Sequence, residues 1–256
     1  MKLFLVAGAA LLALGAVARA ADVEVKAPAS GVVSAPTWAG WYAGLNAGAV
    51  SGEERVAWSA AAAALNGFNN LGASDINTSS PGHVRTAGFT GGGQFGYNFQ
   101  FQSLVAGAEA DLQYTGINGS RSLLSTIFQD PYTQAVQSNW LSTVRGRLGV
   151  TNQSWLLYAT AGLAVGQMNF TDNFLGLHGV GPINSSVSSA RAGWAAGAGA
   201  EVIVARSWSI KLEYLHVDLG SQTDVAQSLV NSAAITHNYS LTGDIARIGT
   251  NYRWTP

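Results

Sequence analysis

The chain has 256 residues, of which 48% are hydrophobic and only 11% are charged, and its formal net charge is −1. Soluble globular chains carry about 25% charged residues, so this composition is unusual for a soluble enzyme. A net charge near zero does not favour nucleic acid as a partner. The absence of cysteine excludes disulfides, thiol nucleophiles and thiolate metal sites.

The N-terminus has the organisation of a secretory signal peptide. Lys2 is followed by an apolar run over residues 3–17 and then by an A-x-A cleavage motif that ends at Ala20 and includes Ala18. The run is shorter than the ~20 residues that a membrane-spanning helix needs. We therefore predict that residues 1–20 are a signal peptide, cleaved after Ala20. Residues 21–37 are rich in Ala, Pro and Ser, and we predict a periplasmic linker there.

From residue 38 onward, apolar positions alternate with polar or glycine positions, which is typical of strands with two different faces. Eight stretches of about ten residues show this alternation. They lie at residues 41–51, 86–99, 104–114, 140–150, 157–166, 192–202, 208–214 and 247–254.

The connections between these stretches alternate in length. Short ones are expected near residues 100–103, 151–154 and 205–207, and long ones near 52–85, 117–138, 171–190 and 220–243. Short turns at one end and long loops at the other are typical of outer-membrane barrels. We predict that residues 38–256 form an all-β, eight-stranded antiparallel up-and-down transmembrane β-barrel in a bacterial outer membrane.

Alternation alone does not distinguish this barrel from a soluble one of the lipocalin type, in which the two faces are exchanged. The glycine-rich polar face fits a narrow barrel interior, where side chains just fill the space, and the apolar face carries no charge in the strand middles. Aromatic residues gather near the strand ends, as membrane-interface girdles do. The predicted girdle residues are Trp41, Phe99, Tyr114, Trp140, Trp155, Phe170, Trp208, Tyr214 and Trp254.

Charged residues interrupt the polar faces of the predicted strands. The segment LVAGAEADLQY places Glu109 and Asp111 on one such face, and WLSTVRGRLGV does the same with Arg145 and Arg147. Charges in a low-dielectric interior must be paired, so we predict an ion-pair network in the lumen. Its predicted members are Glu109, Asp111, Arg145, Arg147, Glu201, Lys211, Glu213, Arg247 and Arg253.

Seven motifs carry a family resemblance, in this order: GGGQFGYNFQ, VAGAEADLQY, TVRGRLGV, LLYATAGLAVG, GWAAGAGAEV, SIKLEYLHVDLG and IGTNYRW. With them the sequence resembles the small outer-membrane β-barrel proteins of alphaproteobacteria, called porin-like or surface-antigen proteins. The resemblance covers residues 38–254. It implies an eight-stranded barrel with exposed antigenic loops, and for some relatives haem binding or a role in envelope integrity. It also implies recognition of the final strand by the outer-membrane insertion machinery, here at Trp254 before Thr255 and Pro256.

Sharper motifs give little support to other functions. GGGQFG at residues 91–96 lacks the helix that a dinucleotide site needs, the four histidines lack metal-ligand spacing, and no hydrolase elbow is present. We predict a structural, surface-exposed role without catalysis or cofactor, with outer-membrane lipid and the insertion machinery as partners. Two alternatives stay open: a narrow porin-like pore for small solutes, and capture of haem or a host ligand by the long loops.

Overall fold

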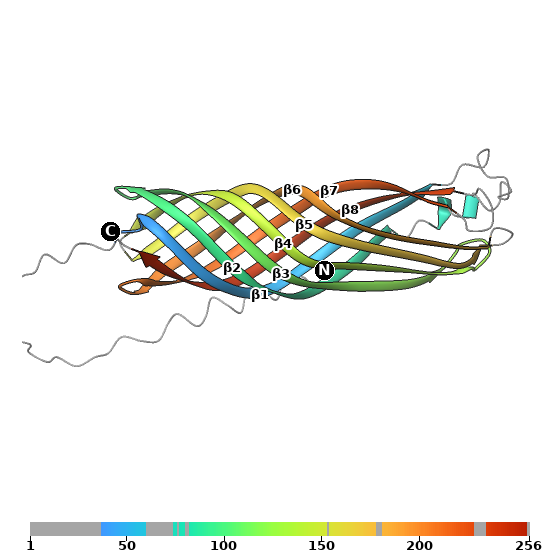
Figure 1. The fold of residues 1–256 in the computed structure, drawn as a ribbon, viewed down its shortest axis with the longest axis horizontal. Helices are drawn as coiled ribbons and strands as arrows, with labels where there is room; N and C mark the ends of the chain where they lie inside the picture. The colour runs from blue at the N-terminus through green and yellow to red at the C-terminus, as the bar shows by residue number, and fades with distance from the viewer. Residues whose placement is uncertain are drawn as a thin grey trace, which may run out of the picture. The chain divides into compact units, whose positions relative to one another are not determined.

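The computed structural model describes residues 37–59, 74–75, 77–79, 82–152, 154–177, 181–227 and 234–254. The predicted signal peptide, and all of the predicted linker except Thr37, lie outside the described residues. The eight strands of the described residues wind around a common axis (Figure 1). They are β1 (Gly40–Ser59), β2 (Gly82–Phe101), β3 (Leu104–Leu124), β4 (Pro131–Asn152), β5 (Trp155–Leu177), β6 (Gly181–Ala205), β7 (Trp208–Gln227) and β8 (Ala234–Trp254).

The strands form one closed antiparallel barrel, in which each strand pairs with the next and β8 pairs with β1. Following directly opposed partners once around the barrel leads from Ala43 to Glu53, ten residues further along β1. Such a stagger accompanies strong strand tilt, and an eight-stranded barrel has an interior just wide enough for side chains.

The strands are about twice as long as the sequence pattern predicts. They contain 20–25 residues, whereas a tilted strand crosses a bilayer with about 9–11. Much of each predicted long loop is therefore strand: β1 continues to Ser59 and β2 begins at Gly82. The prediction ended strands where the apolar alternation stopped, but backbone pairing continues beyond the apolar belt with polar side chains outside.

The two ends of the barrel differ. At the turn end, adjacent strands are joined by tight turns, one of which has Gln102 at φ 53°, and Trp41 of β1 pairs with Trp254 of β8. At the loop end, residues 74–75 and 77–79 of the first long connection dock on the β3–β4 turn, where Thr126 N donates to Ser79 Oγ at 2.7 Å. The Tyr132 hydroxyl also donates to Ser79 O at 3.1 Å. None of the described helical residues forms a helix long and apolar enough to cross a membrane.

Candidate functional site

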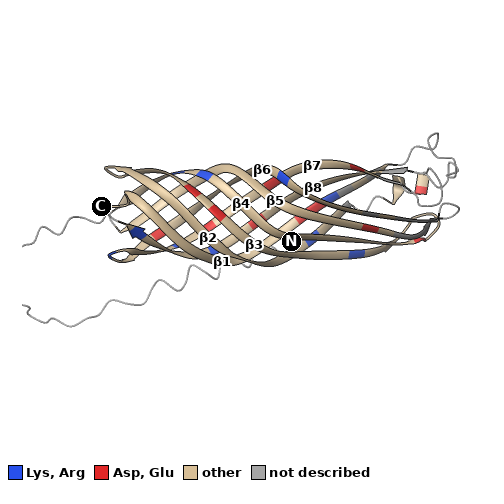
Figure 2. Ribbon diagram, viewed as in Figure 1, with Lys and Arg blue, Asp and Glu red and all other residues tan. Residues whose placement is uncertain are grey.

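The turn-end half of the lumen contains a cluster of eight charged side chains, which we call the charged plug. Its members are Glu109, Asp111, Arg145, Arg147, Glu201, Lys211, Glu213 and Arg247, and all are buried. Figure 2 shows acidic and basic positions on neighbouring strands in the body of the barrel. Strand pairing places several of them side by side, with Glu109 opposite Arg145 and Glu213 opposite Arg247. Four acids therefore meet four bases.

Arg145 is the centre of the plug. Its Nη2 lies 2.8 Å from Glu109 Oε1 and 2.7 Å from Asp111 Oδ2, and its Nη1 lies 3.4 Å from Glu213 Oε1. Arg247 repeats the arrangement from the other side, 2.8 Å from Asp111 Oδ2 and 2.5 Å from Glu213 Oε2. Two arginines thus connect the same carboxylates across the barrel, which ties β3, β4, β7 and β8 together through their side chains.

Lys211 and Glu201 occupy directly opposed positions on β7 and β6, yet their charged atoms have other partners. Lys211 Nζ reaches across the lumen to both oxygens of Glu109, at 2.9 and 3.0 Å. Glu201 accepts from Arg147 Nη2 at 3.0 Å and from Asn251 Nδ2 at 2.8 Å. The narrow interior makes the opposite wall as accessible to a long side chain as the adjacent strand is.

Two tyrosines fill the space that glycines leave. Tyr42 donates to Glu109 Oε2 at 2.9 Å, and Tyr158 donates to Glu213 Oε1 at 2.9 Å. The Arg147 guanidinium lies 4.1 Å above the Tyr158 ring. A Cβ added to Gly96 would lie 2.3 Å from the Tyr42 hydroxyl oxygen, and one added to Gly199 would lie 2.5 Å from that of Tyr158. Glycine at these two positions permits the tyrosines to cross the lumen.

Arg253, which we predicted in the network, lies outside it. The side chain is buried, but its guanidinium stacks at 4.7 Å on the ring of Trp38 and donates to Thr37 O. It forms no ion pair within the described part of the chain. Trp38 is 2% exposed and its backbone N–H donates to Gln100 Oε1 at 2.7 Å. This end of the lumen is therefore closed by Trp38 and Arg253, because the chain before β1 folds back into the opening.

Above the charged plug, the lumen contains an apolar layer that the sequence analysis did not predict. Its buried side chains include Val50, Ile117, Leu141, Ala164, Ala195, Leu215, Val217, Leu219, Leu241 and Ile245. A cavity of about 30 Å³ lies within the layer, close to the volume that one water molecule takes in the liquid. The sequence does carry a signal, since these residues continue the inward parity of their strands, but most of them lie in the predicted loops or at the ends of the predicted strands.

A second polar cluster lies nearer the loop end, and we call it the loop-end cluster: Glu54, Gln134, Asp172, His237 and Tyr239. The Asp172 carboxylate accepts from Tyr239 OH at 2.6 Å and from Gln134 Nε2 at 3.1 Å, and lies 2.9 Å from His237 Nδ1. Glu54 is 1% exposed, and neither of its oxygens has a hydrogen-bond partner among the described residues. Burial, with the Asp172 carboxylate as the second cause, raises the pKa of Glu54 to about 8.

Three of the four histidines lie within the described part of the chain. His83, His216 and His237 lie on strands, and His178 lies outside the described residues. His83 Nδ1 contacts Glu53 Oε1 at 2.7 Å on the outer wall, and His216 contacts Asp244 at 2.9 Å. His237 is fully buried in the loop-end cluster, because β8 extends above the belt that the sequence pattern marked.

The outer wall carries an apolar belt with aromatic side chains at both margins. Trp41, Phe99, Trp155, Trp208 and Trp254 are exposed near the turn end, and Tyr114 and Tyr214 are exposed on the loop side. Trp140, opposite Tyr114, is half-buried.

Phe170 is one of the predicted girdle residues, but it lies in the lumen. It is 4% exposed and stacks on Tyr239 at 4.5 Å between ring centroids. Its even number gives it the inward parity of Tyr158 on the same strand. The prediction relied on its nearness to a strand end and overlooked this parity.

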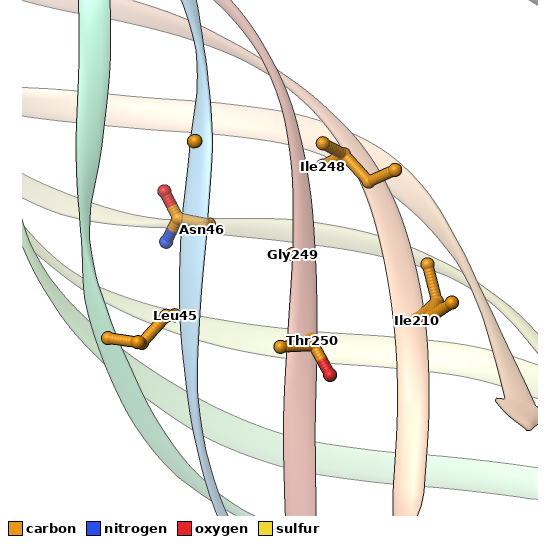
Figure 3. A pocket seen from close by; sticks show the side chains of 7 residues that line it. Leu45, Asn46, Ile210, Ile248, Gly249 and Thr250 are labelled. Atoms are coloured by element: carbon orange, nitrogen blue, oxygen red, sulfur yellow. The ribbon is translucent and has the colours of Figure 1, made fainter. Parts of the chain in front are cut away.

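A shallow groove of about 380 Å³ lies on the outer wall between β7, β8 and β1. In Figure 3, the side chains of Leu45, Ile248 and Ile210 surround Thr250 and Gly249. The three large side chains belong to the exposed apolar belt. This groove faces outward, so it is no part of a path through the lumen.

A model of the outer membrane protein beta-barrel domain matches residues 7–253. The chain belongs to this family. Its localisation is accordingly the outer membrane of a Gram-negative bacterium. Among curated members, the chain is 34% identical to the 31 kDa outer-membrane immunogenic protein of Brucella melitensis biotype 1, over 93% of each chain. It is 33% identical to the 22 kDa outer membrane protein of Rhizobium leguminosarum bv. viciae, over 61% of this chain and 65% of that protein.

Solved structures agree with the fold of the family. The outer membrane protease OmpT of Escherichia coli superposes with a TM-score of 0.51 and 11% identity, over 84% of this chain and 96% of that one. OprG of Pseudomonas aeruginosa superposes with a TM-score of 0.50 and 13% identity, over 84% and 97%. At such identities the likeness concerns the barrel architecture alone.

Proposed function

We propose that this outer-membrane barrel is a closed structural and surface-display protein, without catalysis. The observation that carries the proposal is the filling of the lumen in successive layers: Trp38 with Arg253, the charged plug, the apolar layer and the loop-end cluster. An open channel needs a continuous polar path, as in porins of 16–18 strands. In this barrel the charged side chains bind one another instead of lining a path.

Part of the barrel extends beyond the membrane. Outer-membrane barrels direct short turns to the periplasm and longer loops outward, so the loop-end half is the extracellular extension. The Brucella relatives are named immunogenic proteins, and we infer that this extension, with its loops, is displayed on the cell surface. A protease added to intact cells should cut only in the loop-end connections. Cleavage confined to the tight turns would contradict this orientation.

The decisive experiment is a conductance trace of the refolded mature protein in a planar bilayer, with a 16-stranded porin as positive control. We expect no stable large current, and at most brief small openings. A steady porin-sized current from the monomer would reject the closed barrel and favour the narrow-pore alternative. Loop-mediated capture of haem or a host ligand is tested separately, by binding to the intact barrel before and after surface proteolysis.

Export and insertion form a further part of the proposal. We infer that the insertion machinery recognises the last strand, in which Ile248, Tyr252 and Trp254 all face outward. Trp254→Ala should lower the amount in the outer membrane while leaving cleavage after Ala20 unchanged. The intact mass of the mature protein should correspond to a chain that begins at Ala21. A mass that includes residues 1–20 would contradict the predicted signal peptide.

A further inference from the structure

The outer wall of the extracellular extension carries one basic stripe, on the paired strands β1 and β2. Arg55 lies directly opposite His83, and Arg85 lies opposite Glu53. Arg55 is exposed, and the side chains of Arg85 and His83 are 78% and 50% exposed. Among the described strand residues, Arg55 and Arg85 are the only lysines or arginines whose side chains face outward.

The two other arginines of the extension are held differently. Arg121 donates to His83 O at 3.2 Å, and Arg191 donates to Gln222 Oε1 at 2.9 Å. Both occupy positions with the inward parity of their strands and are half-buried. Arg55, in contrast, makes no hydrogen bond or ion pair with the described part of the chain. Its guanidinium is available to a partner outside the protein.

The backbone of the stripe lies just above the layer of lipid headgroups, within reach of long side chains. Phe89, 61% exposed, is the last large apolar side chain of the belt on β2, and Arg85 follows four residues further from the membrane. At ~3.3 Å per residue and a tilt of about 40°, this separation raises Arg85 by roughly 10 Å. Headgroup layers extend about 5–8 Å beyond the hydrocarbon, and arginine side chains can extend along the wall toward them.

The residues on both sides of the stripe are suited to a sugar. The outward positions of the adjacent strands are Ser240 and Thr242 on β8 and Asn118 and Ser120 on β3. Hydroxyl and amide groups donate to and accept from saccharide hydroxyls, and guanidinium binds phosphate or carboxylate in bidentate fashion. Two cationic side chains flanked by uncharged polar ones, directly above a lipid-facing belt, suit a molecule that combines an anionic group, a sugar and acyl chains.

We propose that Arg55 and Arg85, with His83 beside them, bind the anionic headgroup of an acylated glycolipid in the outer leaflet. The acyl chains then lie against the apolar belt below, and the sugar meets the polar side chains on either side. Glu53, 3.8 Å from Arg85 Nε and 2.7 Å from His83 Nδ1, competes with the headgroup for both bases and limits the affinity.

The test uses native mass spectrometry of the folded mature protein, titrated in detergent with a diphosphorylated, acylated glucosamine disaccharide. Each arginine near an anionic lipid headgroup contributes to the binding affinity. Arg55→Gln or Arg85→Gln should therefore weaken binding about fivefold, and the double variant should weaken it about twentyfold. Glu53→Gln should strengthen it. Arg206→Gln, which removes an exposed charge at the β6–β7 turn, is the matched control and should change nothing.

Two further arms identify the ligand. Phosphatidylglycerol should bind more weakly than the glycolipid, and 10 mM inorganic phosphate should not displace the glycolipid. Equal binding by the double variant, equal binding of phosphatidylglycerol, or full displacement by free phosphate would each overturn the proposal. Heat-dependent gel mobility verifies that every variant is folded. Since Glu53→Gln predicts a gain, its failure to strengthen binding would count against the stripe even if the arginine variants were unstable.

Discussion

The two halves of the lumen satisfy buried polar groups in opposite ways. In the membrane-spanning half, four acids and four bases share a network in which Arg145 and Arg247 each contact more than one carboxylate. In the extracellular half, Asp172 accepts from Gln134 and Tyr239 and contacts His237 Nδ1, and Glu54 has no partner among the described residues. The apolar layer separates the two. A narrow barrel can therefore close itself with ion pairs or with apolar packing, and the two solutions should respond differently to mutation and pH.

Removing Arg145 should produce the largest effect. Arg145→Met leaves Glu109, Asp111 and Glu213 with less positive charge in a dry interior, and breaking a buried ion pair costs about 3–5 kcal/mol. Urea unfolding from lipid vesicles would measure the loss. Adding Glu109→Gln should recover part of it, because contacting residues couple. Arg85→Met, on the outer wall, is the control and should change the unfolding free energy by less than ~0.5 kcal/mol. Strictly additive effects would show that the plug is not a network.

Glu54 should make the extracellular half less stable as pH rises. Its carboxyl group ionises near pH 4.5 when unfolded, whereas its pKa in the folded protein is about 8. Below pH 4.5 the carboxyl group is neutral in both states and its ionisation costs no stability. As pH rises from 4.5 toward 8, the unfolded state ionises first, so the free energy of unfolding falls. The loss should be about 2–4 kcal/mol by pH 9. In the wild type, the hydrogen-exchange protection factors of the upper β1 and β8 amides should fall over this pH range.

Glu54→Gln is the matched variant for this pH dependence. The amide cannot ionise, so the protection factors of the upper-strand amides, which are corrected for the intrinsic pH dependence of exchange, should become nearly independent of pH between 5 and 9, while those around the charged plug remain unchanged. An identical pH profile in both proteins would mean that another group controls the stability of the extracellular half.

The tyrosines of the plug should be sensitive to a single methyl group. Gly199→Ala places a Cβ 2.5 Å from the Tyr158 hydroxyl oxygen, and overpacking of this kind costs about 1–3 kcal/mol. Gly146→Ala is the matched control on the lipid-facing side, where the nearest atom, Ala161 O, is 3.9 Å away. Unfolding in urea should distinguish them. Equal stability of the two variants would show that Tyr158 can leave the lumen without cost.

Sequence alternation predicted the strand number, the order of turns and the inward direction of Glu109 and Arg145, because a period of two fixes the face of every residue once one face is assigned. It did not predict partners across the lumen. The contact between Lys211 and Glu109 depends on barrel diameter and stagger, which no short segment encodes. The extracellular half was missed for another reason: outside the membrane both faces can be polar, so the alternation disappears around Glu54 and His237 although pairing continues.

The rim should show the smallest effect. Ser79 joins the docked segment, residues 74–75 and 77–79, to the β3–β4 turn, accepting from Thr126 N at 2.7 Å and donating to Asp75 Oδ1 at 3.2 Å. Ser79→Ala removes both bonds, and a typical hydrogen bond contributes about 0.5–1.5 kcal/mol. Because the contacts of the segment within the described part of the chain lie at the rim of the barrel, we expect faster exchange of the Thr126 and Ile127 amides without a change in global unfolding. Faster exchange in the charged plug would instead mean that the docked segment stabilises the whole barrel, and that the two halves of the lumen are mechanically coupled through the apolar layer.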